Sequence, residues 1–310
     1  MKNNKWSPLK KGDIVDVIAP GWATDHKALK KAEKFLKSWG LKARFPKSIY
    51  QPHFLGSNTS SKRFSHFQAA LKKKDSKVIW CLRGGYGSLH LLPYLQKMKK
   101  PKNSKLLIGI SDITSLHSFL VSNWGWPTLH GPLLDRVANG KLLKKHELEF
   151  KKLIFGELPI LEFKKLKALN PAARKNKKIR AQVVGGNLTV FQSLIGTKSY
   201  TKLKNKILFI EDIGERAYRI DRELEHLLQI GELNQVKALI FGEFMGVDET
   251  DGKNHMNKLM QIWAGRLKAP VLKGLEAGHG LVQRPIFLGT NAELQLGKKI
   301  ILKIDRKSVV

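Results

Sequence analysis

The stretch Leu106-Leu107-Ile108-Gly109-Ile110-Ser111-Asp112-Ile113-Thr114 joins an apolar run to an amphipathic one. Leu116, Phe119 and Leu120 follow at helical spacing, so the sequence predicts a buried strand, a turn carrying Ser111, and a helix. A serine on such a turn lies beside a helix N-terminus, where developing negative charge is stabilised, so Ser111 is a candidate nucleophile. The same residues also fit a plain helix cap, and Ile113 stands where the G-x-S-x-G pattern has its second glycine. The choice depends on partner residues elsewhere in the chain.

Strands and helices alternate along the first half of the chain. A strand is expected at 13–19, a helix from 25 to 39, a strand at 78–82 and a helix through 89–95. This alternation predicts an α/β fold with a mostly parallel sheet and helices on both faces. Ligands of such sheets bind beyond the carboxyl ends of the strands, and both the segment 83–87 and Ser111 fall there.

A length of 310 residues favours two domains. Periodicity is lost and basic residues accumulate between about 159 and 180, after which strand and helix patterns resume. We therefore expect an N-terminal α/β domain at 1–158 that carries the nucleophile, a basic linker at 159–180, and a smaller C-terminal α/β domain at 181–310.

The chain is strongly basic, with 57 lysines and arginines against 25 acidic residues and a net charge of +32. Nucleic acid or an anionic wall polymer is a conceivable partner, but the lysines are spread along the chain and no nucleic-acid-binding motif accompanies them, so this reading is not favoured. No segment is long and apolar enough for a membrane span, and the first residues do not form a signal peptide. We expect a cytoplasmic protein; a periplasmic one, exported by another route, is the alternative.

A serine nucleophile needs a base and usually an acid, which the histidines and carboxylates of the chain can supply. His279 lies between two glycines in a loop, whereas His26, His66, His90, His146, His226 and His255 lie in or beside predicted helices among charges and are expected at the surface. Glu211 and Asp212 end a buried-looking strand, where carboxylates are costly unless they are paired. With one cysteine and no H-E-x-x-H pattern, neither a disulfide framework nor a metal site is expected.

The segment Arg83-Gly84-Gly85-Tyr86-Gly87 matches no phosphate-binding pattern. Its glycines instead allow backbone N–H groups to approach Ser111. We expect the N–H groups of Gly85 and Asp112 to form an oxyanion hole.

Taken together, these stretches resemble the LD-carboxypeptidase family of serine peptidases, which also includes microcin C self-immunity proteins. The matching blocks run in the family's order from about residue 13 to 296: Arg83-Gly84-Gly85-Tyr86-Gly87, Gly109-Ile110-Ser111-Asp112-Ile113-Thr114, His130-Gly131-Pro132, Gly185-Gly186-Asn187-Leu188, Glu211-Asp212-Ile213-Gly214-Glu215, Tyr218-Arg219-Ile220-Asp221-Arg222 and Gly278-His279-Gly280. One departure is Gly21-Trp22, where the family often has small hydroxyl residues; the pocket wall there is expected to differ.

The resemblance implies a Ser-Glu-His triad at Ser111, Glu211 and His279, in a cleft between two α/β domains. It implies removal of terminal D-alanine from a murein tetrapeptide, with Arg83, Gly84 and Tyr86 at the substrate, no cofactor, and a homodimer as a further expectation. Within the family, the alternative is a self-immunity peptidase that cleaves aminoacyl-nucleotide compounds. Outside the family, the alternative is a non-catalytic protein that binds an anionic polymer. Such binding would weaken with salt and would not depend on Ser111.

Overall fold

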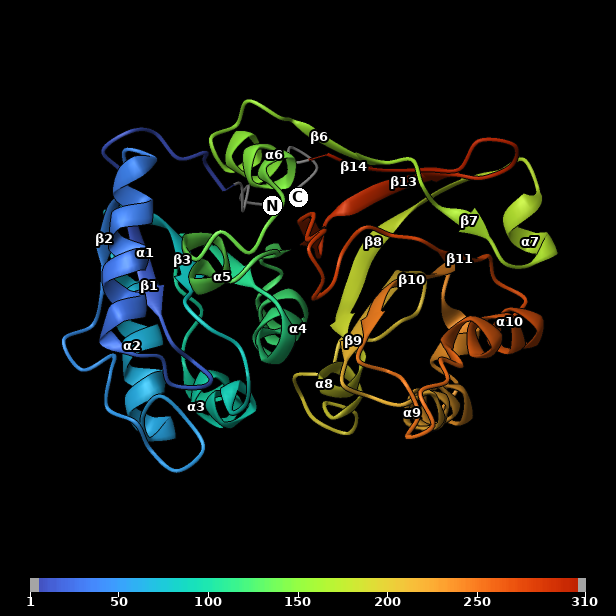
Figure 1. Cartoon of the computed structure of the whole chain (residues 1–310), viewed down its shortest axis with the longest axis horizontal. Helices are drawn as coiled ribbons and strands as arrows, with labels where there is room; N and C mark the ends of the chain where they lie inside the picture. The colour runs from blue at the N-terminus through green and yellow to red at the C-terminus, as the bar shows by residue number, and fades with distance from the viewer. Residues whose placement is uncertain (1–5, 306–310) are drawn as a thin grey trace.

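Two β-sheets organise the chain, whose computed structural model describes residues 6–305 (Figure 1). The first sheet has the strand order β12-β5-β4-β3-β1-β2. Its neighbours are parallel except that β12 runs antiparallel to β5. Its strands are β1 (Ile14–Ile18), β2 (Lys42–Arg44), β3 (Ser76–Cys81), β4 (Leu106–Gly109), β5 (Thr128–His130) and β12 (Ile286–Leu288).

Helices cover both faces of this sheet, as expected for a parallel sheet. Successive side chains of β3 point to opposite faces: Val78 and Trp80 join one buried apolar cluster, and Ile79 and Cys81 join the other. The helical segments of this half are α1 (His26–Ser38), α2 (Ser60–Lys72), the 3₁₀ helix η1 (Ser88–Leu91), α3 (Leu92–Lys97), the 3₁₀ helix η2 (Ser111–Ile113), α4 (Thr114–Trp124), α5 (Leu134–Ala138) and α6 (Lys144–Ile154). The predicted α/β class is confirmed.

The second sheet has eight strands in the order β6-β14-β13-β8-β9-β10-β11-β7. β8, β9, β10 and β11 form its parallel centre, and the flanking pairs are antiparallel. Its strands are β6 (Ile160–Phe163), β7 (Lys167–Ala168), β8 (Lys178–Asn187), β9 (Ile207–Ile213), β10 (Ala238–Met245), β11 (Val271–Lys273), β13 (Asn291–Gln295) and β14 (Ile301–Asp305). The helices are α7 (Pro171–Arg174), α8 (Leu188–Gln192), α9 (Ala217–Gln229), η3 (Leu233–Gln235) and α10 (Met256–Arg266).

Residues 159–180, expected as a basic linker, contain β6, β7 and α7. β6 pairs with β14 and β7 with β11, so both strands lie at edges of the second sheet. Strands of four and two residues are too short to show a periodic pattern in the sequence. The chain also returns once to the first sheet, because β12 lies between β11 and β13 of the second sheet in sequence and pairs with β5 of the first.

The two halves meet along α4, the helix that follows the turn with Ser111. The backbone N–H of Asn187, at the end of β8, donates to Thr114 Oγ1 at 3.1 Å, and Ser118 Oγ donates to the carbonyl of Ser199 at 2.7 Å. Thr114 and Asn187 are both buried. The contact fixes the helix that follows the candidate nucleophile against the second sheet.

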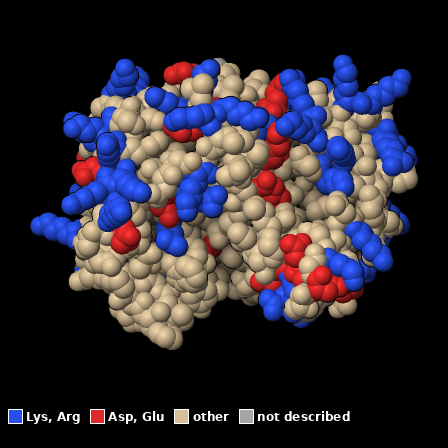
Figure 2. Space-filling view, in the orientation of Figure 1, with Lys and Arg blue, Asp and Glu red and all other residues tan. Residues whose placement is uncertain are grey.

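Basic side chains are spread over much of the face in Figure 2, with acidic ones among them. Across residues 6–305, no helix has the length and apolar character needed to cross a membrane.

Two histidines predicted at the surface are instead buried. His66 lies on the inner face of α2 with Nε2 3.0 Å from Ser48 Oγ, and His146 lies on the inner face of α6. Charged neighbours in sequence misled the prediction, because residues three and four apart, not adjacent ones, share a helix face.

Candidate active site

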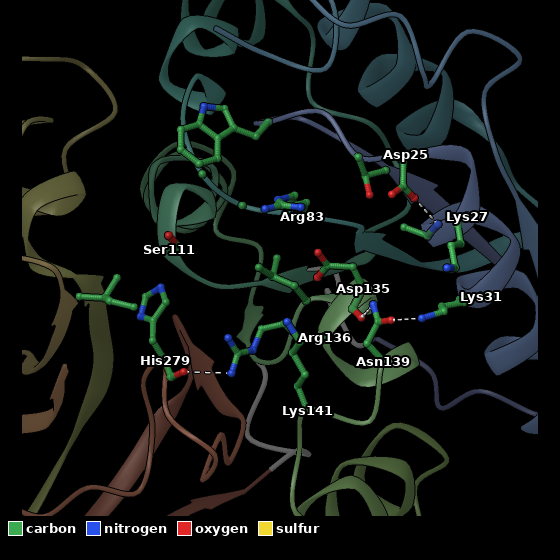
Figure 3. A pocket seen from close by; sticks show the side chains of 17 residues that line it. Asp25, Lys27, Lys31, Arg83, Ser111, Asp135, Arg136, Asn139, Lys141 and His279 are labelled. Carbon is green, nitrogen blue, oxygen red and sulfur yellow. Dashed lines mark hydrogen bonds between the residues drawn. The ribbon is translucent and has the colours of Figure 1, made fainter. Parts of the chain in front are cut away.

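Ser111 occupies the turn between β4 and α4, as predicted. Its φ is +68°, one of two positive values among the non-glycine residues described here. A left-handed conformation is uncommon for serine and costs about 1 kcal/mol or more, so the surrounding structure must hold it. The turn directs the side chain away from the strand and into a cavity (Figure 3).

The glycine loop after β3 lies directly against this turn. A Cβ atom at Gly84 would stand 3.1 Å from Ser111 Cβ, so a side chain there would crowd the serine. Gly85 has φ +99° and lies under the ring of Trp22. Trp22 is 48% exposed and lines the cavity, so the departure noted in the sequence lies in the cavity wall.

His279 and Glu211 form a buried pair on the second half. His279 Nδ1 lies 2.6 Å from Glu211 Oε2. Glu211 lies near the end of β9 and is fully inaccessible, and His279 follows β11 in a loop. With Nδ1 bound, the proton-accepting nitrogen left to His279 is Nε2, which has no hydrogen-bond partner among residues 6–305.

The charge of Glu211 controls the titration of His279. Burial alone would lower the pKa of His279, but the adjacent Glu211 carboxylate more than offsets this, and the pKa is raised from its ordinary value of 6.5. His279 therefore holds a proton more readily than a free imidazole does.

Two charged residues that the sequence gave no reason to select hold the His279 loop from opposite sides. Arg136, on α5 of the first half, donates from Nη2 to the carbonyls of His279 at 3.1 Å and Gly280 at 3.3 Å. Glu243, on β10 of the second half, accepts the N–H of Gly280 at 2.8 Å. The carboxylate of Glu243 lies 2.5 Å from where a Cβ of Gly280 would stand, so a side chain at this position would displace Glu243.

Ser111 and His279 line one cavity of about 480 Å³ at the carboxyl ends of the strands of the first sheet. They lie on the same side of it, and Lys27 and Lys31 lie on the other side (Figure 3). The lining is mainly cationic, with five basic side chains against Asp25 and Asp135: Lys27, Lys31, Arg83, Arg136 and Lys141. Such a cavity suits an anionic ligand.

The remaining predicted residues divide into two groups. Arg83, Gly84 and Gly85 line the cavity, whereas Tyr86 does not and packs edge-on against His90. Asp112 points away from the cavity, since its Oδ2 accepts the N–H of Ser88 at 2.9 Å, but its backbone follows Ser111. Asp212 is buried rather than solvated and accepts hydrogen bonds from Asn187 and Thr189.

A serine on a strand-to-helix turn that lines the same cavity as a buried histidine–carboxylate pair is typical of hydrolases that use a serine nucleophile. The LD-carboxypeptidase N-terminal domain model matches residues 15–131, and the LD-carboxypeptidase C-terminal domain model matches residues 180–294. The chain belongs to the LD-carboxypeptidase family of serine peptidases, and it is an enzyme of the hydrolase class.

Known proteins resemble the chain along almost its whole length. A relative in Rickettsia conorii, whose name assigns it as a carboxypeptidase without a substrate, is 34% identical and covers 93% of this chain and 90% of its own. The crystal structure of muramoyltetrapeptide carboxypeptidase from Oxalobacter formigenes is 28% identical, with a TM-score of 0.82 over 94% of this chain and 98% of its own. The microcin C7 self-immunity protein of Escherichia coli is 26% identical over 98% of this chain and 94% of its own.

Proposed function

We propose that this protein is a serine LD-carboxypeptidase that releases the terminal D-alanine of a murein tetrapeptide. The observation that carries the proposal is that Ser111 lines the same cavity as His279, which is paired with Glu211. The name of the Oxalobacter formigenes neighbour supports the substrate class.

In the proposed reaction, Ser111 Oγ attacks the carbonyl carbon of the scissile amide while His279 Nε2 takes its proton. Glu211 orients the imidazole and stabilises its charged form. The backbone N–H groups of Gly85 and Asp112 bind the developing oxyanion. The C–N bond then breaks, the imidazolium protonates the leaving amine, and D-alanine departs. A water molecule, activated by His279, hydrolyses the acyl ester and restores Ser111.

Substrate binding is assigned to the cationic lining. A murein tetrapeptide carries several carboxylates, and five basic side chains face the cavity that contains Ser111. We assign Arg83 and Gly84 to substrate contacts. Tyr86 lies outside the lining, so a contact with it would involve a part of the substrate beyond the cavity.

A second candidate is a self-immunity-type peptidase that cleaves aminoacyl-nucleotide compounds. It is favoured by the 26% identity to the Escherichia coli self-immunity protein over almost the whole chain. The same three side chains would perform the chemistry. For the main candidate, we propose action in the cytoplasm.

The test is incubation with murein tetrapeptide and, in parallel, with an aminoacyl-sulfamoyl nucleoside, followed by detection of released D-alanine or nucleoside product. We expect D-alanine from the wild type and a loss of about 10³-fold or more in kcat for Ser111→Ala. The exposed Ser193→Ala variant is the matched control and should keep full activity. Undiminished hydrolysis by Ser111→Ala would refute the assignment of Ser111 as the nucleophile. Exclusive cleavage of the nucleoside compound would favour the second candidate.

A further inference from the structure

The position of the leaving group follows from the proposed function, on which this inference rests. In a serine peptidase the imidazole protonates the amine that leaves, so the released residue lies on the histidine side of the scissile bond. In a carboxypeptidase this residue is the last one, and its carboxylate is joined to the leaving nitrogen through a single carbon atom. A cation that recognises this carboxylate must therefore lie beside His279.

Arg136 is the cationic side chain that meets this requirement. Its Nη2 donates to the carbonyl of His279 itself, at 3.1 Å. The side chain is half-buried and lines the cavity. Its other terminal nitrogen, Nη1, makes no hydrogen bond within the part of the chain that the structure describes, and Figure 3 shows the guanidinium directed toward His279.

The other basic residues of the lining fit this role less well. Arg83 adjoins the glycine loop, on the oxyanion side of Ser111, and its side chain is exposed, as is that of Lys141. Lys31 is bound to Asn139 at 2.6 Å on the opposite side of the cavity, where Lys27 also lies (Figure 3). A guanidinium already fixed by two carbonyls loses little further freedom when it binds a carboxylate, and its planar fork can serve both partners.

We propose that Arg136 binds the free carboxylate of the terminal D-residue through Nη1 while its Nη2 holds the His279 loop. The released residue is thus recognised by the side chain that positions the general base. This contact makes the enzyme an exopeptidase, because an amide or a longer chain at that point would leave the guanidinium without its anionic partner.

The test compares two substrates: murein tetrapeptide with a free terminal carboxylate, and the same peptide ending in D-alaninamide. The measured quantity is the ratio of kcat/KM for the acid to kcat/KM for the amide. We expect a wild-type ratio of about 10 to 100, the range expected of a charge-assisted hydrogen bond. Arg136→Gln should bring the ratio close to one. Arg83→Gln and the exposed control Arg180→Gln should keep the wild-type ratio.

The ratio separates carboxylate recognition from loop positioning. If Arg136 only positions His279, Arg136→Gln will slow both substrates equally and keep the wild-type ratio, which would overturn the proposal. Should Arg136→Gln not fold, Arg136→Met decides, since it keeps an apolar stem but has no charge and no donor for the carboxylate; an unchanged ratio in that variant overturns the proposal. Wild-type enzyme that cleaves acid and amide equally refutes the inference but not the proposed function, whereas cleavage of neither peptide refutes both.

Discussion

His279 Nδ1 and Glu211 Oε2 lie 2.6 Å apart, although 68 residues separate them in the sequence. Both side chains are buried, and the second oxygen of Glu211 has no hydrogen-bond partner among residues 6–305. The carboxylate therefore acts mainly on the histidine, as an orienting group and as a negative charge in a site with little water.

The first prediction concerns the pH dependence of hydrolysis. The base works as neutral imidazole, and Glu211 raises the pKa of His279, so kcat/KM for the wild type should be lost as the pH falls through a midpoint above 6.5. Glu211→Gln removes the negative charge, so its midpoint should move to lower pH, and its kcat should fall by about 10³- to 10⁴-fold. Steady-state kinetics from pH 5 to 9 measures both, with the exposed Glu157→Gln variant as control. A Glu211→Gln midpoint equal to or above that of the wild type would contradict the assignment.

The second prediction concerns the loop that carries His279. Glu243 accepts the Gly280 N–H at 2.8 Å, and a glutamine at this position could accept the same bond through its amide oxygen. Glu243→Gln should thus keep kcat within about threefold of the wild type, whereas Glu243→Ala should lower kcat by about 10-fold or more, with a smaller change in KM. Comparing the two variants in the D-alanine release assay separates the hydrogen bond from the charge. Equal kcat values for both variants would show that this bond does not position His279.

The local sequence was sufficient to select Ser111, Glu211 and His279 as candidate site residues. The serine and the glutamate end apolar strands, and the histidine stands between glycines, so each has a distinctive neighbourhood. Their convergence depended on the family resemblance, because spacing along a chain does not specify which strand ends meet in space.

Arg136 and Glu243 could not be selected in this way. Arg136 is one of 57 basic residues and lies 143 positions before His279, with ordinary helix formers around it. Glu243 lies within a strand. What distinguishes it is its contact with the His279 loop, and the sequence does not show that this strand and this loop are neighbours. Likewise β12 has three residues, too few for a pattern, and its pairing with β5 is set by tertiary packing.

A buried acidic cluster behind the active site gives the third prediction. The hydroxyl of Thr189 lies 2.9 Å from Asp212 Oδ2 and 3.0 Å from Glu223 Oε1. One hydroxyl carries one hydrogen, so it cannot donate to two ionised carboxylates at once. Burial, and then the charge of Asp212, raises the pKa of Glu223 to about 7, and a protonated Glu223 can itself donate to Thr189.

Glu223→Gln should therefore stabilise the protein in alkaline solution. The pKa of Glu223 is about 7 in the folded state against an ordinary 4.5, so folding favours the protonated form, and the wild type loses stability as the pH rises from 4.5 through 7. The glutamine amide donates to Thr189 at every pH. The free energy of unfolding of Glu223→Gln should match that of the wild type near pH 4.5 and exceed it by about 1 to 3 kcal/mol at pH 8. Urea unfolding at both pH values measures the difference, and the exposed Glu157→Gln variant should follow the wild type at each. A Glu223→Gln variant less stable than the wild type at pH 8 but equal to it at pH 4.5 would contradict a raised pKa of Glu223 in the folded protein.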